Sequence, residues 1–363
     1  MSEIEKRKQQ HMELASSDDA QSGRSALWED VFLLPASLPE ISIGEVDLST
    51  TFLGHRLQAP FLIAGMTGGH EGALDVNRKL AKAAARLGIA IGTGSQRAAL
   101  ADPRLTPTYS VVREQARDSF VIGNLGMSQM VAQGSAPAFG PADLAAAVGM
   151  IDADAMAIHL NAVEELVQTE GDREMRGIAS AIADCVEWSP VPLIAKETGA
   201  GMTRESALAL GDTGVRGLDV GGIGGTSFAR IEALRARGAG DERGVRVGAT
   251  FADWGLPTAI SILEASGAGL PLIATGGVRN GLHAAKAIAL GATLIGIGSP
   301  AINAALISDD AVIQELSLMI EELRVAMTLI GVPDLESLRK HRPMVIGRVA
   351  EWQRARRGDA RHS

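Results

Sequence analysis

Eight short apolar runs, spread over residues 61–300, constrain the fold more than any other feature of the sequence. Each holds about four to six residues of Ile, Leu, Val or Ala without alternation of apolar and polar side chains. Such runs are typical of strands buried on both faces of a parallel sheet. They are FLIAGMTGG (61–69), IAIGTGSQR (89–97), FVIGNLG (120–126), AMAIHLN (155–161), PLIAKE (192–197), GLDVGGIGG (217–225), LIATGG (272–277) and LIGIGSP (294–300).

Alanine-rich stretches with apolar residues at helical spacing separate the runs, as in GALDVNRKLAKAAARLG and NGLHAAKAIALGA. Eight strand–helix repeats in a chain of 363 residues predict a single-domain (β/α)8 TIM barrel. A doubly wound α/β sheet is the competing architecture, although eight such even units would be unusual for it. The longer interval between Asp219 and Leu272 predicts an insertion after strand six.

Three regions are expected along the chain. Residues 1–23 are polar and predict a mobile N-terminal extension. Residues 24–345 form the barrel domain, in which 24–60 cover the barrel bottom and an amphipathic helix from Asp309 to about Ile330 comes last. Residues 346–363 are expected to be a basic C-terminal tail, frayed over RARRGDARHS (354–363).

Composition excludes several classes of protein. A net charge of −9 and an aromatic content of 3% argue against a nucleic-acid-binding surface. The single cysteine, Cys185, excludes a disulfide framework and favours a reducing compartment. The sequence has neither a membrane-spanning apolar stretch nor an apolar secretory signal. We therefore expect a cytoplasmic protein that binds neither nucleic acid nor membranes.

Glycine is frequent, at 42 residues, and concentrates at the carboxyl ends of the predicted strands. Such glycines either form tight turns or let backbone amides approach a phosphate or a flat ring; their recurrence at most strand ends favours the second interpretation. Loops seven and eight form the usual phosphate site of barrels. The sequence lacks a dinucleotide-binding glycine motif after a first strand, so a mononucleotide fits better. The phosphate-site candidates are Gly276, Gly277, Val278, Gly298 and Ser299.

The end of the fourth strand carries His159, Asn161, Glu164 and Glu165 within seven residues. His159 and Asn161 are two apart on a strand and therefore point the same way, into the barrel mouth. His159 alone would be a hydrogen-bonded core histidine, and a glutamate at a helix start a partner of the helix dipole. Together these residues favour a functional site, in which a carboxylate could bind Mg²⁺.

Two further strand ends carry cations. Lys196 ends a strongly apolar run, so it needs an anionic or electron-rich partner. Ser95, Gln96 and Arg97 follow the second strand together, and there Arg97 is a candidate diphosphate clamp.

The chain resembles the type 2 isopentenyl-diphosphate isomerases from about Arg7 to Gly331. The resemblance is carried by RKQQHMELA, MTGG, GTGSQR, GNLG, HLN with the two glutamates, KE, DVGGIGGTS, WGLPTA, ATGGVRNGLHAAKAIALGA and LRVAMTLIG, in this order. It implies an FMN-dependent barrel that interconverts isopentenyl and dimethylallyl diphosphate. The flavin must be reduced, Mg²⁺ is required, and NADPH commonly supplies the electrons. The resemblance also implies a homotetramer or homo-octamer.

The resemblance assigns roles to individual residues. His159, Asn161 and Glu164 would be catalytic and Glu165 would bind Mg²⁺. The residues implied to contact the flavin ring are Gly65, Met66, Thr67, Ser95, Asn124, Lys196 and Thr226, with Gly276, Gly277, Val278, Gly298 and Ser299 at its phosphate. The residues implied to bind the substrate diphosphate are Arg7, Lys8, Ser95, Gln96, Arg97, His159, Asn161 and Glu164.

Some positions depart from the family pattern. Glu164 stands where Gln is usual, Pro35 where His is usual and Phe228 where Trp is usual, and residues 127–150 are longer than usual. A paralogue that acts on another prenyl diphosphate, or that runs a net redox reaction, is therefore an alternative. A 2-hydroxy-acid oxidase would need a strand-end Arg–His pair, and Arg279 lacks that histidine. A non-catalytic flavin-binding barrel is the third alternative.

Overall fold

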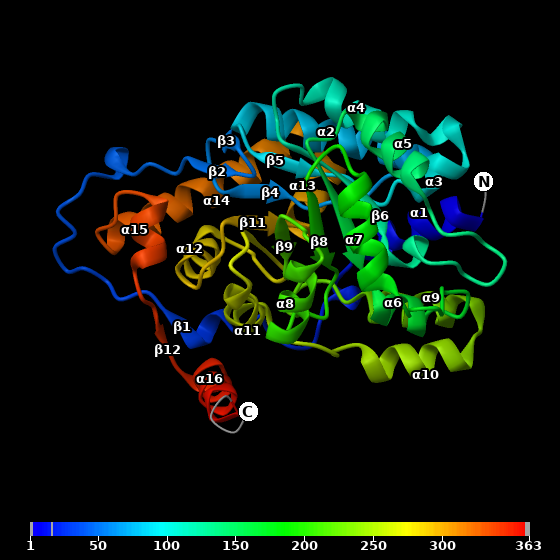
Figure 1. Cartoon of the computed structure of the whole chain (residues 1–363). Helices are drawn as coiled ribbons and strands as arrows, with labels where there is room; N and C mark the ends of the chain where they lie inside the picture. Colours follow the sequence, from blue (N-terminus) through cyan, green and yellow to red (C-terminus); the bar gives the residue numbers. More distant parts are fainter. Residues whose placement is uncertain (1–2, 16, 360–363) are drawn as a thin grey trace.

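The computed structural model, which describes residues 3–15 and 17–359, contains a closed barrel of eight parallel strands (Figure 1). Every predicted strand is present, so the (β/α)8 prediction is confirmed and the doubly wound alternative is wrong. The barrel strands are β4 (Phe61–Ile63), β5 (Ala90–Gly92), β6 (Val121–Gly126), β7 (Ala155–Leu160), β8 (Leu193–Glu197), β9 (Gly217–Asp219), β10 (Leu272–Thr275) and β11 (Leu294–Ile297).

The barrel closes where β11 pairs with β4, with Ile295 opposite Phe61 and Ile297 opposite Ile63. An outer layer of helices buries the other face of the strands. In α2, for example, Ala73, Val76 and Leu80 recur at helical spacing and are buried. The outer helices are α2 (Glu71–Leu87), α3 (Arg97–Ala101), α4 (Pro107–Gln115), α5 (Pro141–Ile151), α6 (Ala162–Val167), α7 (Ile178–Trp188), α8 (Arg204–Asp212), α11 (Thr258–Ala265), α12 (Gly281–Ala289), α13 (Ser299–Ile307) and α14 (Asp309–Leu329).

The predicted insertion after the sixth strand forms two helices, α9 (Phe228–Ala239) and α10 (Glu242–Phe251), which pack on each other and on α6. Together with the N-terminal helix α1 (Glu3–Ala15) they lie at the carboxyl ends of the strands (Figure 1). Short 3-10 turns complete the described chain at Asp18–Ala20, Trp28–Asp30, Ile43–Glu45, Pro103–Leu105, Met127–Met130 and Ser266–Ala268. None of the described helices is long and apolar enough to cross a membrane.

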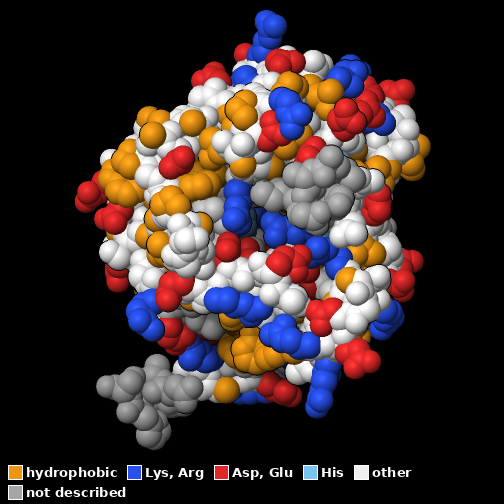
Figure 2. Space-filling view, turned by 90° about the vertical axis from the view of Figure 1, so that its right-hand side faces the viewer, with side chains coloured by type: hydrophobic (Ala, Val, Ile, Leu, Met, Phe, Trp, Pro, Cys, Tyr) orange, Lys and Arg blue, Asp and Glu red, His pale blue; other side chains and the backbone are white. Residues whose placement is uncertain are grey.

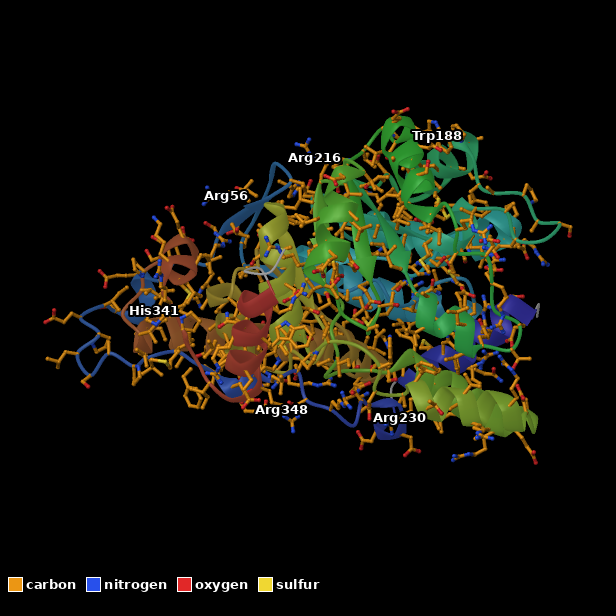
Figure 3. All side chains as sticks on the ribbon, turned by 60° about the horizontal axis from the view of Figure 1, so that its bottom comes forward. Arg56, Trp188, Arg216, Arg230, His341 and Arg348 are labelled. Carbon is orange, nitrogen blue, oxygen red and sulfur yellow. The ribbon has the colours of Figure 1, made fainter. Side chains whose placement is uncertain are left out.

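The hairpin of β2 (Thr50–Phe52) and β3 (His55–Leu57) forms the barrel floor. Phe52 and Leu57 are buried against Leu62 and Phe120 at the amino ends of the strands. In Figure 3 Arg56 and Arg216 lie toward one end of the barrel, away from Arg230 on α9.

The expectation that all of residues 24–60 cover the bottom is wrong for the start of this segment. Ala26 packs instead against Gly224 and Gly277, in loops at the opposite end of the barrel. The backbone carbonyl of Ala26 also accepts a hydrogen bond from Ala259, which fixes the segment there.

The C-terminal region is more ordered than expected. After α14 the chain forms α15 (Leu335–Lys340), then β12 (Met344–Val345), which pairs with β1 (Val31–Phe32), and finally α16 (Gly347–Asp359). The expected frayed tail is therefore wrong as far as Asp359. The Trp352 indole donates a hydrogen bond of 2.7 Å to Glu264, and Arg356 pairs with the same carboxylate, so α16 is held on α11.

We expect Phe52→Ala to lower the free energy of unfolding by about 3–5 kcal/mol, because a buried aromatic ring is removed from the barrel floor. Urea unfolding monitored by circular dichroism measures this loss. Thr51→Ala, an exposed position on the same hairpin, should change the value by less than about 0.5 kcal/mol. Equal effects of the two substitutions would show that the hairpin does not support the core.

Candidate active site

A cleft opens at the carboxyl ends of the barrel strands and contains most of the predicted site residues. Helix α1 lies along one side of it, and Figure 2 looks onto this face, where Lys and Arg side chains gather around a central hollow. The predicted residues that line the cleft are Arg7, Lys8, Gly65, Met66, Thr67, Ser95, Arg97, Asn124, His159, Asn161, Glu164, Glu165, Lys196, Thr226, Gly276, Gly277, Val278, Gly298 and Ser299.

The loops after β10 and β11 form a cradle of backbone. Gly276 has a φ of +111°, and a Cβ atom there would lie 2.0 Å from the carbonyl oxygen of Gly222. A Cβ on Gly225 would lie 3.0 Å from the amide nitrogen of Gly277. Ser299 begins helix α13, and its hydroxyl lies 2.9 Å from that of Thr226. Closely spaced amides beside a helix N-terminus suit a phosphate group.

Trp28, which the sequence did not indicate, supports this cradle. Its indole nitrogen donates a hydrogen bond of 2.9 Å to the carbonyl of Gly277. The indole ring stacks on His283, with centroids 5.9 Å apart. His283 is half-buried in this stacking, and it lies on α12 rather than at a strand end.

The wall formed by the loops after β4 and β5 is flat, because its glycines lie directly on neighbouring backbone. A Cβ at Gly65 would lie 2.2 Å from the carbonyl oxygen of Thr93, and one at Gly94 would lie 2.8 Å from the carbonyl carbon of Thr67. Met66 extends from this wall and is 37% exposed. The wall and the cradle together fit a flat ring system joined to a phosphate.

A continuous row of polar side chains crosses the ends of β6 to β9. His159 Nδ1 lies 2.7 Å from Asn124 Oδ1. His159 is opposite Lys196 in the β7–β8 register, and Lys196 is opposite Asp219 in the β8–β9 register. The Lys196 ammonium lies 3.1 Å from Asp219 Oδ2, which supplies the anionic partner that the sequence required for Lys196.

His159 is neutral in this environment. Burial, followed by the nearby charges of Lys196 and Lys8, lowers the pKa of His159 to about 3. Because Asn124 Oδ1 can only accept, the hydrogen bond assigns the proton to Nδ1 and leaves Nε2 with a free lone pair.

Asn161 joins the two glutamates. Its amide nitrogen donates to Glu164 Oε2 at 3.2 Å and to Glu165 Oε1 at 3.0 Å. Asn161 Oδ1 is buried and has no hydrogen-bond partner among the described residues. An unsatisfied amide oxygen beside the buried carboxylate of Glu165 is a fitting pair of ligands for Mg²⁺.

Glu164 faces a second cluster that the sequence did not predict. His11 Nε2 lies 2.6 Å from Glu232 Oε1, and His11 Nδ1 lies 3.8 Å from Glu164 Oε1. Arg235 pairs with the other oxygen of Glu232 at 2.5 Å. Burial raises the pKa of Glu164, and the negative charges of Glu232 and Glu165 add to this shift against the effect of His11. His11 could have been predicted from the sequence, because it lies one helical turn from Arg7 in α1. No sequence pattern indicated Glu232.

Lys8 anchors helix α1 to the rim of the barrel. Its ammonium donates to the carbonyl oxygens of Ser95 (2.6 Å) and Gly68 (3.0 Å) and to the Tyr109 hydroxyl (2.9 Å). Burial, with Arg7 and Arg97 nearby, lowers the pKa of Lys8 to about 7. In this arrangement all three ammonium donors are used within the protein.

The prediction that Gln96 belongs to the substrate site does not agree with the structure. It is fully buried and does not line the cleft. Its amide nitrogen donates to the carbonyl of Ala147 at 2.7 Å, and its oxygen accepts from the amide of Asn124 at 2.9 Å. Because the chain turns into α3 here, Gln96 points between β6 and α5, where it holds the two elements together.

The barrel, the flat glycine wall and the phosphate cradle define a flavin-binding class of protein, and sequence comparison agrees. The profile of the FMN-dependent dehydrogenase family matches residues 3–102 and 159–344. The fold resembles those of a mandelate oxidase (17% identity, TM-score 0.60, covering 92% of this chain and 99% of the other) and flavocytochrome b2 (16%, 0.63, 91% and 81%).

Within this class the chain belongs to the isopentenyl-diphosphate delta-isomerases, an isomerase family. The enzyme of that name from Methanosarcina acetivorans is 45% identical over 343 residues, which cover 94% of this chain and 92% of the relative. The relative from Archaeoglobus fulgidus is 42% identical, with coverages of 96% and 97%. The resemblance noted in the sequence is confirmed.

We expect Gly276→Ala to weaken FMN binding by tenfold or more, about 1.4 kcal/mol, because the new methyl group would collide with the Gly222 carbonyl. Quenching of FMN fluorescence on titration with flavin-free protein measures the dissociation constant. Gly267→Ala, at an exposed turn with space around it, should bind FMN as the unchanged protein does. Unaltered binding by Gly276→Ala would mean that the cradle does not hold the flavin.

Proposed function

We propose that this protein isomerises isopentenyl diphosphate to dimethylallyl diphosphate with reduced FMN and Mg²⁺. The observation that carries the proposal is that one cleft combines a cradle of closely spaced backbone amides with a separate group of cationic and polar side chains, each suited to an anion. The glycine cradle with Ser299 lies at one, and Arg7, Arg97 and His159 lie at the other. The first suits the phosphate of FMN and the second the diphosphate of a substrate placed against the ring.

The chain's own residues would hold FMN along its whole length. Gly65, Met66 and Thr67 would contact the ring, and Gly276, Gly277, Val278, Gly298 and Ser299 the phosphate. Ser95, Asn124, Lys196 and Thr226 would hydrogen-bond the polar edge. When bound and reduced, the flavin supplies an acid/base group and an electron-rich plane for shifting a double bond between carbons that carry no acidic protons.

The substrate diphosphate would be bound by the cations of the mouth. Arg97 is oriented by Asp172 at 3.2 Å, and Arg7 by Gln168 at 3.4 Å. His159 lines the cleft, and a bound anion would favour its protonation. Ser95 and Asn161 complete the polar rim. Lys8 would attract the diphosphate by its positive charge without contacting it, because its ammonium is held by Ser95, Gly68 and Tyr109. Helix α1 then covers the substrate and excludes water.

Glu165 and Asn161 Oδ1 would bind Mg²⁺ beside the diphosphate. The adjacent Glu164 is partly buried between Asn161, His11 and Glu232. Its carboxyl group can hold a proton at Oε1, but the proposed reaction does not require it to. The neighbouring charge of Glu165 is one of the causes that raise the pKa of Glu164.

NADPH is the proposed reductant, and a cytoplasmic homotetramer or homo-octamer the proposed working form. Exposed apolar side chains at Leu34, Leu38 and Ile43 support an assembly of several copies. Mass photometry of the purified protein tests this part of the proposal.

The decisive experiment is an isomerase assay of the purified holoenzyme. We expect a yellow protein that bleaches with dithionite or NADPH and then converts isopentenyl diphosphate in the presence of Mg²⁺. A colourless protein after expression with excess flavin would contradict flavin binding. A yellow protein that is inert toward isopentenyl diphosphate would favour the paralogue that uses another prenyl diphosphate or a net redox reaction.

We expect Glu164→Gln to retain or increase isomerase activity, because the amide keeps the hydrogen bonds and removes a carboxylate charge beside Glu165 and Glu232. Initial rates at saturating substrate measure this effect. Glu187→Gln, at an exposed carboxylate on α7, is the matched control and should be unchanged. A collapse of activity in Glu164→Gln alone would identify Glu164 as the working acid/base.

We expect Glu165→Gln to raise the Mg²⁺ concentration for half-maximal activity about tenfold or more, since a neutral amide oxygen is a weaker ligand for a hard cation. Activity titrated with MgCl₂ after treatment with EDTA measures this shift. If the titration matches that of the unchanged protein, Glu165 does not bind the metal.

A further inference from the structure

Lys196 and Asp219 form a largely buried ion pair at the carboxyl ends of the neighbouring strands β8 and β9. Their side chains are only 12% and 2% exposed, and Nζ lies 3.1 Å from Oδ2. The β8–β9 register places the two residues directly opposite each other. The strand pairing holds the two backbones side by side, and the low exposure of both side chains keeps the ammonium next to the carboxylate.

The two partners differ in what else they reach. Lys196 lines the cleft and also donates to the carbonyl of Glu197 at 3.2 Å. Asp219 does not line the cleft, and its other oxygen receives only a long contact of 3.4 Å from the amide of Gly221. Asp219 therefore does not contact a molecule in the cleft, and Lys196 is the member of the pair that can.

We propose that Asp219 is a positioning residue that fixes the Lys196 ammonium and offsets its charge, and thereby sets the balance between oxidised and reduced flavin. This inference rests on the proposed function, which places Lys196 at the polar edge of FMN. It adds a residue that does not itself contact the flavin.

Reduction adds two electrons to the ring, so a nearby positive charge favours the reduced form. A carboxylate held against the ammonium weakens that field at every point in the cleft, and the effect is large where water is excluded. Asp219 also keeps the buried ammonium in one position, because an unpaired charge there would have to find another partner. The pair therefore presents the flavin with an ordered, partly neutralised donor.

The test compares the redox equilibrium of bound FMN in the intact holoenzyme and in Asp219→Asn. The amide preserves shape and can still accept from Lys196, but it removes the negative charge. We expect the ratio of reduced to oxidised FMN at a fixed poise to rise tenfold or more, equal to about 30 mV for a two-electron couple. Absorbance during slow anaerobic reduction with a reference dye measures the ratio.

A variant that binds FMN weakly can be tested equally well. The ratio of the dissociation constants of oxidised and reduced FMN reports the same equilibrium through the binding cycle, so it should also shift tenfold. Asp219→Glu, which retains the charge, should lie nearer to the unchanged protein than Asp219→Asn does. Glu264→Gln is the control for the loss of a paired carboxylate. Glu264 lies on α11 and pairs with Arg356 of α16, outside the cleft, so this variant should leave the ratio unaltered.

A double substitution separates action through Lys196 from a direct effect of charge. In a Lys196→Gln background there is no ammonium for Asp219 to hold or to offset, so adding Asp219→Asn should change the ratio by much less than tenfold. An equal shift with and without Lys196 would overturn the proposal. So would an unchanged ratio in Asp219→Asn while the protein still binds FMN and isomerises its substrate. Loss of flavin binding or of isomerisation in the unchanged protein would instead contradict the proposed function.

Discussion

The parallel register of the barrel strands is the constraint on which the rest of this structure depends. Asn124, His159, Lys196 and Asp219 lie far apart in the chain, yet strand pairing brings them into one row at the barrel mouth. A shift of one residue in any strand would turn its side chain away from the cleft. Closure of β11 on β4 leaves no free edge along which such a shift could occur.

The site is not complete with the barrel alone. Helix α1 supplies Arg7 and His11, and the ammonium of Lys8 attaches the helix to two carbonyl oxygens and a phenol. His11 lies between carboxylates from α6 and α9, so the N-terminal helix and the insertion after β9 meet over the cleft. Two segments added to the repeating barrel thus close one side of the cleft. In the proposed function they form its substrate side, and the repeats form its flavin side.

The sequence predicted the strands well because each is a short apolar run that ends in glycine, a pattern with few alternative structures. It predicted Gln96 poorly for a clear reason. Ser95 and Arg97 line the cleft, but the side chain between them leaves on the other side of the backbone as α3 begins. The tail was misjudged because its charges suggested solvent, whereas Arg356 and Trp352 find a buried carboxylate on α11. Such pairings join residues about ninety positions apart and leave no local pattern.

By itself, the sequence determined the barrel, the end of the barrel at which the cleft opens, the glycine-rich strand ends that line it, and the family. These follow from local chemistry, since apolar periodicity and missing Cβ atoms act where they occur in the chain. Only the tertiary structure decided which polar groups are partners: Asp219 with Lys196, Glu232 with His11, and Trp28 with the Gly277 carbonyl. Charge and hydrogen bonding act over a few ångströms, and only the closed barrel brings these residues, which are distant in the chain, within that range.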